Sequence, residues 1–328
     1  MSTQVVIMFP YSGYDPDTDL GKQREKIFWK VVETCRTITA TEDRLPVVIL
    51  NRDTQKRGNA QAFLADPRAN QDGDSKNRQV SIRRTWSVDT CQMWLSGWGD
   101  VLDTANVKDD DHIVQLPGDV DVVDDNTYGQ SFFDKLSTFI DMRSWDIVVG
   151  DFTSGDTFNA KELIDLYGTF ALMANWFPDI AQRIRRLPLK KPRSEFINIR
   201  VKTLNELLEH RKFAYEQTLN MLIRSWDPEK KDWKYKIKTE ALGTLKDDST
   251  FRQYRDCLDQ IERTERMLKL LWREVNEVDA KLLQVNHQEY KEQYQAYIDF
   301  YDRLDRRSTS IRENARIIIR NILGLGPQ

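Results

Sequence analysis

The sequence predicts an α/β fold: a mostly parallel β-sheet with helices on its faces, followed by a helical C-terminal extension. In the first half, short apolar runs alternate with segments of helical periodicity, which is the pattern of strands joined by crossover helices. The second half has few such runs, and residues 249–323 contain neither Gly nor Pro. Long stretches of this kind are typical of extended helices.

Four apolar runs are the main predicted strands. They are rich in Val and Ile, as strands buried on both faces of a sheet usually are. They cover residues 5–10, 46–50, 113–116 and 146–152. The run at 79–82 is a shorter strand candidate.

The segments between these runs carry the predicted helices. Ile27, Val31, Cys35 and Ile38 recur at helical spacing within one of them. The helices are expected at residues 21–38, 85–102 and 132–142. Residues 54–78 are polar and rich in Gly, Asn and Asp, so they predict a long loop with at most one helical turn.

The second half is predicted to be mainly helical. An alternating segment with one basic face, residues 233–239, is a further strand candidate. The expected helices cover residues 160–176, 204–211, 215–226 and, as two or three long helices, 249–323. We therefore expect two domains, 1–248 and 249–328, and the apolar stripes of the second suggest a homodimer formed through 249–323.

Composition narrows the range of functions. The net charge of −3 gives no sign of a general nucleic-acid binder. Three cysteines without a CxxC pair argue against a zinc site or a disulfide framework. No signal-peptide pattern opens the chain, and no apolar run approaches the ~20 residues of a membrane span. A cytoplasmic protein without a membrane span is expected.

The run from His112 to Asp125 carries the most informative motif. An apolar strand leads through Gly118 into Asp119 and Asp121, which are one residue apart. Alternate residues of an extended segment project to the same side, so both carboxylates could bind one hard cation, Mg²⁺ or Mn²⁺. Such an ion stabilises the diphosphate that leaves a nucleotide sugar. An acidic turn after a strand would have the same sequence of Gly and Asp residues.

The position of other polar residues strengthens the motif. In parallel sheets, ligands bind at the carboxyl ends of the strands. Polar side chains follow several predicted strands at that end, namely Asn51, Asp53, Asp119, Asp121 and Asp151.

The order of these segments resembles the GT-A glycosyltransferases, whose fold is Rossmann-like. Three later stretches, residues 162–167, 175–181 and 193–196, are similar to a region of the glucosyl-3-phosphoglycerate synthase and mannosylglycerate synthase group. The resemblance covers roughly residues 4–250. It implies sugar transfer from a nucleoside diphosphate sugar with Mg²⁺ or Mn²⁺, and a retaining reaction.

The resemblance also implies roles for individual residues. Those that would contact the donor nucleotide and its diphosphate are Phe9, Pro10, Tyr11, Ser12, Asn51, Asp53, Arg83, Arg84 and Gly118. Asp119 and Asp121 would bind the metal, and Glu195 would meet the acceptor. Asp119, Asp121, Glu195 and Arg84 are the expected catalytic group.

This chain departs from the family pattern at three places. Arg83-Arg84-Thr85 replaces a Gly-Lys-Gly segment, and Ser194 replaces a loop glycine. A late histidine that serves the family as a metal ligand is absent, so Asp247 or Asp248 would substitute, with Asp248 taken as the third ligand.

Two alternatives to a glycosyltransferase remain open. A nucleotidyltransferase shares a similar sheet and a metal-held diphosphate, although its Gly-rich, Arg-containing loop is not found after the first strand. A catalytically inactive scaffold of the same fold, assembled through its C-terminal helices, would account for the missing histidine. The sequence names neither the sugar, the base nor the acceptor.

Overall fold

The computed structural model describes residues 1–8, 17–42, 44–51, 63–70, 77–85, 98–99, 101–103, 106–118, 120–122, 131–153, 168–189, 191–208 and 217–246, with six positions between 264 and 272. The chain divides into two compact units. One contains residues 1–155 and 186–248, and the other contains 156–185 and 249–328.

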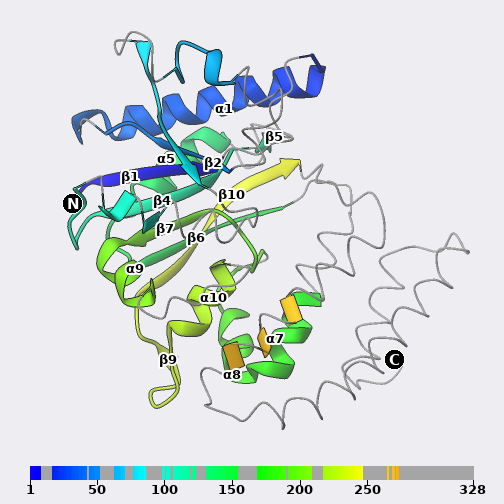
Figure 1. Ribbon diagram of the computed structural model, residues 1–328. Coiled ribbons are helices and arrows are strands. Elements are labelled where there is room, and N and C mark those ends of the chain that lie inside the picture. Colours follow the sequence, from blue (N-terminus) through cyan, green and yellow to red (C-terminus); the bar gives the residue numbers. More distant parts are fainter. Residues whose placement is uncertain are drawn as a thin grey trace, which may run out of the picture. The chain divides into compact units, whose positions relative to one another are not determined.

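An eight-stranded sheet forms the centre of the first unit (Figure 1). Its order is β3-β2-β1-β4-β7-β6-β10-β5. The strands are β1 (Thr3–Met8), β2 (Val47–Asn51), β3 (Ser81–Thr85), β4 (His112–Pro117), β5 (Asp121–Val122), β6 (Ile147–Thr153), β7 (Ile197–Arg200) and β10 (Ile237–Lys246). The neighbours β3-β2-β1-β4 and β6-β10 pair in parallel, whereas β7 is antiparallel to both its neighbours. The predicted α/β fold with a mostly parallel sheet is confirmed.

Helices α1 (Asp19–Ile38) and α5 (Phe132–Ile140) cover one face of this sheet (Figure 1). Thr18 begins α1 as a side-chain cap, because its hydroxyl accepts a hydrogen bond from the backbone N–H of Gly21 at 3.0 Å. The apolar faces of both helices meet alternate strand residues in one continuous core. This packing explains why the helical periodicity of the sequence located both helices.

The opposite side of the sheet carries α9 (Val201–Leu208) and α10 (Gln217–Arg224), which lie below the strands in Figure 1. A short hairpin follows α10 and consists of β8 (Trp226–Asp227) and β9 (Asp232–Trp233). Its two indole rings pack edge to face at 5.5 Å between centroids.

The structure departs from the predicted elements at several places. The strand expected at 233–239 begins only at Ile237 and continues to Lys246, because the preceding residues complete the β8–β9 hairpin. Thr85 belongs to β3, not to a helix. Strand β7 was not predicted, and it lies near the middle of the sheet.

The second unit is described through two short helices and a few further positions. These are α7 (Phe170–Trp176), the Pro-initiated α8 (Pro178–Ile184) and helical residues between 264 and 272. Leu268 and Leu271 are buried, and the rings of Trp176 and Trp272 lie 6.0 Å apart. In the described part of the chain, no helix is both long and apolar enough to cross a membrane.

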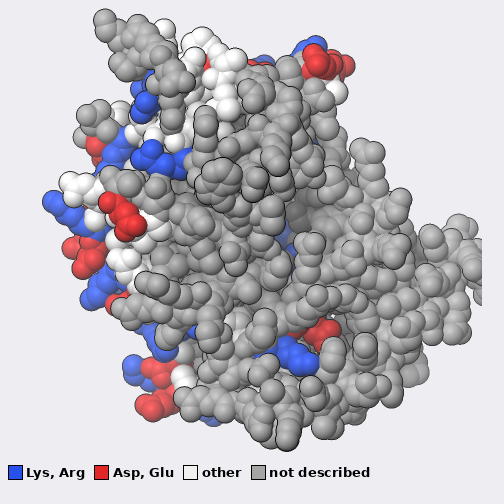
Figure 2. Space-filling view, in the orientation of Figure 1, with Lys and Arg blue, Asp and Glu red and all other residues white. Residues whose placement is uncertain are grey.

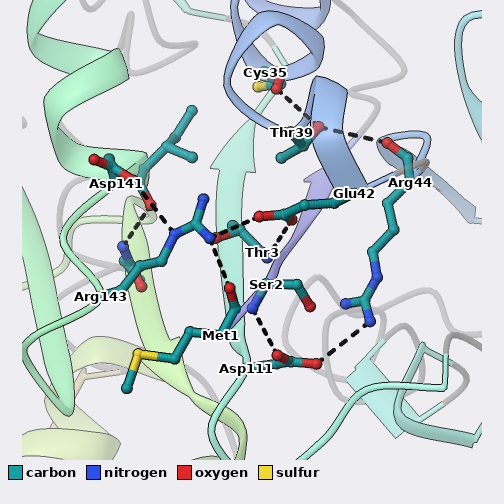
Figure 3. A network of polar contacts seen from close by, with 12 residues as sticks. Met1, Ser2, Thr3, Cys35, Thr39, Glu42, Arg44, Asp111, Asp141 and Arg143 are labelled. Atoms are coloured by element: carbon teal, nitrogen blue, oxygen red, sulfur yellow. Dashed lines mark hydrogen bonds and ion pairs between the residues drawn. The ribbon is translucent and has the colours of Figure 1, made fainter.

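A polar network fastens the amino edge of the sheet, where β1 starts (Figure 3). Asp111 accepts hydrogen bonds from the backbone N–H of Ser2 at 2.6 Å and from Arg44 at 3.3 Å. Glu42 accepts from the backbone N–H of Thr3 at 2.6 Å and from Arg143 at 2.7 Å. Two carboxylates therefore anchor the first strand at the edge opposite to the predicted site.

Burial acts to raise the pKa of Asp111, but its partners outweigh burial. Backbone N–H groups of Lys108 and Ser2 donate to the carboxylate, and the Arg44 guanidinium adds positive charge, so the pKa lies below its ordinary value. This carboxylate is thus held ionised as a structural anchor.

Candidate functional site

The candidate site is the carboxyl edge of the sheet, where the parallel strands end. Strands β1, β2, β4, β6 and β10 point toward this edge. β1, β2 and β4 are parallel to one another, and so are β6 and β10. The two groups share one direction because β7 is antiparallel to both β4 and β6. β7 begins here, so the residues just before Ile197 reach the same edge. Ligands of open α/β sheets bind at this edge.

The motif after β4 follows an unusual path. Val120 is buried in the core beneath α1 and α5, and the next residue, Asp121, opens β5. β5 pairs antiparallel with the end of β10, with Asp121 opposite Lys246. The segment that leaves β4, in the middle of the sheet, is thereby hydrogen-bonded to β10 near the end of the strand order. The backbone of Asp121 is held at the carboxyl end of β10.

Hydrogen bonds attach the segment before β7 to β6. The backbone N–H of Lys191 donates to Asp151 Oδ1 at 2.8 Å, and Ser194 Oγ donates to the carbonyl of Gly150 at 2.5 Å. The Thr218 hydroxyl of α10 donates to the Ser194 carbonyl. Ser194, which replaces the loop glycine of the resembling family, therefore holds the segment in place through its side chain.

Glu195 lies between the ends of β4 and β6. Ile197 pairs with Gln115 on one side and with Val149 on the other, and Glu195 precedes it by two residues. The buried Gln115 donates its Nε2 hydrogen to the Glu195 carbonyl at 3.0 Å. The predicted acceptor residue thus stands at the centre of the carboxyl edge, and its backbone is held by β4.

A buried cation accompanies this segment. The Lys191 side chain is 2% exposed, and its Nζ lies 5.3 Å from the centroid of the Phe152 ring. A cation–π contact of this kind offsets part of the cost of removing the ammonium from water. Arg193, two residues later, is half-buried. The segment that carries Lys191 and Arg193 is therefore partly inside the protein, and its backbone contacts Asp151.

Arg83 and Arg84 lie within β3, at the outer edge of the sheet order. Arg83 pairs with Ile49 and Arg84 with Leu50. Successive residues of a strand belong to opposite faces, so the two positions do not share a face. Only one of them can serve a diphosphate bound on a given side.

Several predicted site residues lie outside the described residues: Phe9, Pro10, Tyr11, Ser12, Asp53, Asp119, Asp247 and Asp248. For Asn51, Asp121 and Arg84 the structure describes the backbone position alone. Gly118 is described and half-buried directly after β4. Within the described ranges, no three His, Cys, Asp or Glu side chains gather as metal ligands.

Sequence reasoning did not single out Gln115 as a residue that supports the site. Its signal was a polar residue inside an otherwise apolar strand, which calls for a buried hydrogen-bond partner. Asp151 was noted only as a strand end, although it holds the backbone of Lys191.

No family model matches the chain, and no curated protein is detectably similar to it. Among solved structures, a protein of Desulfovibrio desulfuricans G20, provisionally described as a nucleotide-diphospho-sugar transferase, is similar over 82% of this chain and 99% of its own. The identity is 8% and the TM-score is 0.38. A likeness of this size assigns the chain to no family.

Proposed function

We propose that the protein is a metal-dependent glycosyltransferase that uses a nucleoside diphosphate sugar. One observation carries the proposal: the pairing of β5 with the end of β10 holds the backbone of Asp121 at the carboxyl edge of the sheet, where β1, β2, β3, β4 and β6 also end. An acidic turn alone would not require the two residue pairs that join β5 to the end of β10. This pairing is well suited to hold a carboxylate motif in one place.

The same pairing suggests a third metal ligand. Asp121 pairs with Lys246 and Val122 with Leu245. In the sequence, Asp119 precedes Asp121 by two residues and Asp248 follows Lys246 by two. Asp119, Asp121 and Asp248 would then supply three carboxylates, a donor set that suits Mg²⁺ or Mn²⁺. The bound ion would supply positive charge to the departing diphosphate.

Residues of the protein itself would bind the donor nucleotide and the acceptor. The segment after β1, with Phe9 to Ser12, together with Asn51 or Asp53, would hold the base and ribose. Arg83 or Arg84 would add charge near the diphosphate from β3. Glu195 and the Lys191–Arg193 segment would bind an acceptor, and the cations there favour an anionic one. A retaining transfer is proposed from the resemblance to the synthase group.

A thermal-shift panel of nucleotide sugars, with and without Mn²⁺ or Mg²⁺, tests the proposal. A ligand that binds only the native state at 100 times its Kd adds about 2.7 kcal/mol of stability, equivalent to several degrees in Tm. We expect such a shift for one nucleotide sugar, only with metal. Asp121→Asn should abolish the shift and lower transfer at least about 100-fold, whereas the exposed Asp109→Asn should retain both.

The Asp121→Asn and Glu195→Gln variants separate donor binding from acceptor binding. Glu195→Gln should keep the metal-dependent shift while transfer to the acceptor falls, because its proposed role is in acceptor binding. Release of pyrophosphate from a nucleoside triphosphate would replace the proposal by a nucleotidyltransferase. A folded protein that responds to no nucleotide sugar would point to an inactive scaffold.

A further inference from the structure

A cleft of about 980 Å³ runs along α1, away from the residues of the candidate site. Its lining on the helix extends from Lys22 to Thr37 and continues at Thr39 to Leu45. With a rise of 1.5 Å per residue, this part of the helix is about 22 Å long. The lining residues thus follow one elongated stretch of surface, a form that suits a linear ligand.

The cleft is positively charged although the chain carries a net charge of −3. Among the described residues that line it, six side chains are cationic and two, Glu25 and Glu33, are carboxylates. The cations are Lys22, Lys26, Lys30, Arg36, Arg44 and Arg68. The face of the molecule shown in Figure 2 carries described side chains of both charges.

The six cations are not equally available. Arg44 pairs with Asp111, and Arg68 pairs with Asp66 at 2.6 Å and Glu25 at 3.3 Å. Lys22, Lys26 and Arg36 are exposed, and within the described part of the chain no ion pair engages them. Lys22, Lys26 and Lys30 recur every four residues, so they form a stripe along the helix with steps of about 6 Å.

The rest of the lining indicates which polyanion fits. Trp29 is 7% exposed, and the Arg68 guanidinium covers its ring at 4.0 Å, so it offers no face for stacking a nucleobase. Among the described residues of the lining, the apolar ones are the buried Trp29, the half-buried Leu45 and the small Ala40, so no large exposed apolar side chain offers an anchor to a peptide. Its concave form does not match a flat bilayer. Thr37 and Gln79 contribute neutral polar groups suited to hydroxyls.

We propose that this cleft binds a linear anionic glycan, a single polysaccharide chain that carries sulfate, phosphate or carboxylate groups. Regularly spaced ammonium groups would meet the repeating charges of the polymer, and the neutral polar groups would meet its hydroxyls. The inference does not depend on the proposed transferase activity, because binding here requires neither donor nor metal.

Fluorescence anisotropy with a labelled dextran sulfate fragment tests the cleft in the full-length protein. We expect binding that weakens as salt rises and no binding of uncharged dextran. The triple variant Lys22→Ala, Lys26→Ala, Arg36→Ala should raise Kd at least tenfold. A matched control, Lys202→Ala, Lys234→Ala, Lys236→Ala, removes the same charge from exposed positions outside the cleft lining and should change Kd less than twofold.

Equal weakening by the two triple variants would overturn the proposal, since it would show attraction to charge in general. Tighter binding of a single-stranded oligodeoxynucleotide than of dextran sulfate would overturn it in favour of nucleic acid. Binding to anionic phospholipid vesicles with the same dependence on Lys22, Lys26 and Arg36 would overturn it in favour of a membrane surface.

Discussion

At the scale of single residues, His112 shows how a buried polar group is fitted into the sheet. Its Nδ1 lies 2.7 Å from Asn198 Oδ1, while Asn198 Nδ2 donates to the carbonyls of Phe139 and Ile140 at the end of α5. Because the amide hydrogens of Asn198 are used there, its oxygen must accept, and the proton of the neutral imidazole is assigned to Nδ1. The pair ties β4, β7 and α5 together.

Burial lowers the pKa of His112, and the positive charges of Arg200 and Arg143 lower it further against the opposing Asn198 hydrogen bond. The unfolded chain should titrate near its ordinary value, about 6.5. Below that pH, His112 is protonated more readily in the unfolded state than in the folded state. The free energy of unfolding therefore falls as the pH is lowered. We expect a loss of up to about 1.4 kcal/mol per pH unit between pH 6.5 and the folded-state pKa.

Urea unfolding at pH 7.5 and pH 5.5 measures this effect. His112→Asn keeps a donor toward Asn198 but does not titrate, so its loss of stability between the two pH values should be smaller than that of the wild type. The same loss in both proteins would show that other groups cause the pH dependence. Asp111, whose pKa is lowered, titrates below this range.

At the scale of elements, the close packing of β6 depends on Gly150. A Cβ at this position would lie 2.6 Å from Phe196 Cβ and 2.7 Å from Leu242 Cδ1. Gly150→Ala should therefore cost about 1–3 kcal/mol through overpacking, and it should disturb the segment that carries Glu195. Gly99→Ala is the control, because a Cβ there meets no atom of the described residues within 4 Å. Chemical denaturation should show a lower free energy of unfolding for Gly150→Ala than for Gly99→Ala. Equal values for the two variants would contradict the packing argument.

Elements with a continuous apolar pattern could be predicted from the sequence. β1, β2, β4 and β6 coincide with the four Val- and Ile-rich runs, and α1 and α5 with the helical periodicity. β7 was missed because it is four residues long and contains the polar Asn198, whose partners are distant in sequence. The pairing of Asp121 with Lys246 joins residues far apart in the chain, which no local pattern encodes.

The candidate site shows the same division. The carboxyl edge followed from the alternation of strands and helices. The place of Glu195 at this edge depends on β7, which was not predicted, and its acceptor role rests on the resemblance alone. The opposite-face placement of Arg83 and Arg84 required knowing that β3 extends to Thr85. The supporting roles of Gln115 and Ser194 depend on contacts across the sheet. The metal-binding roles of Asp119, Asp121 and Asp248 stay predictions.

At the scale of the whole molecule, the C-terminal apolar stripe is partly used inside its own unit. Leu268 and Leu271 recur at helical spacing in the expected C-terminal helices, and both are buried. Trp176 of α7 contacts Trp272 in the same unit. A homodimer formed through 249–323 remains a proposal, and it would have to use other parts of the stripe than these two leucines.

The division into two compact units makes a prediction about cooperativity. Leu268 is fully buried, so Leu268→Ala should remove about 2–5 kcal/mol of stability through the lost side chain and the cavity it leaves. If the units open independently, hydrogen exchange should speed up in α7 and α8, while β1 and β4 keep their protection. Equal loss of protection in β1 and β4 would show that the chain unfolds as one cooperative body. Retained metal-dependent donor binding by this variant would place the proposed site within the unit that contains the sheet.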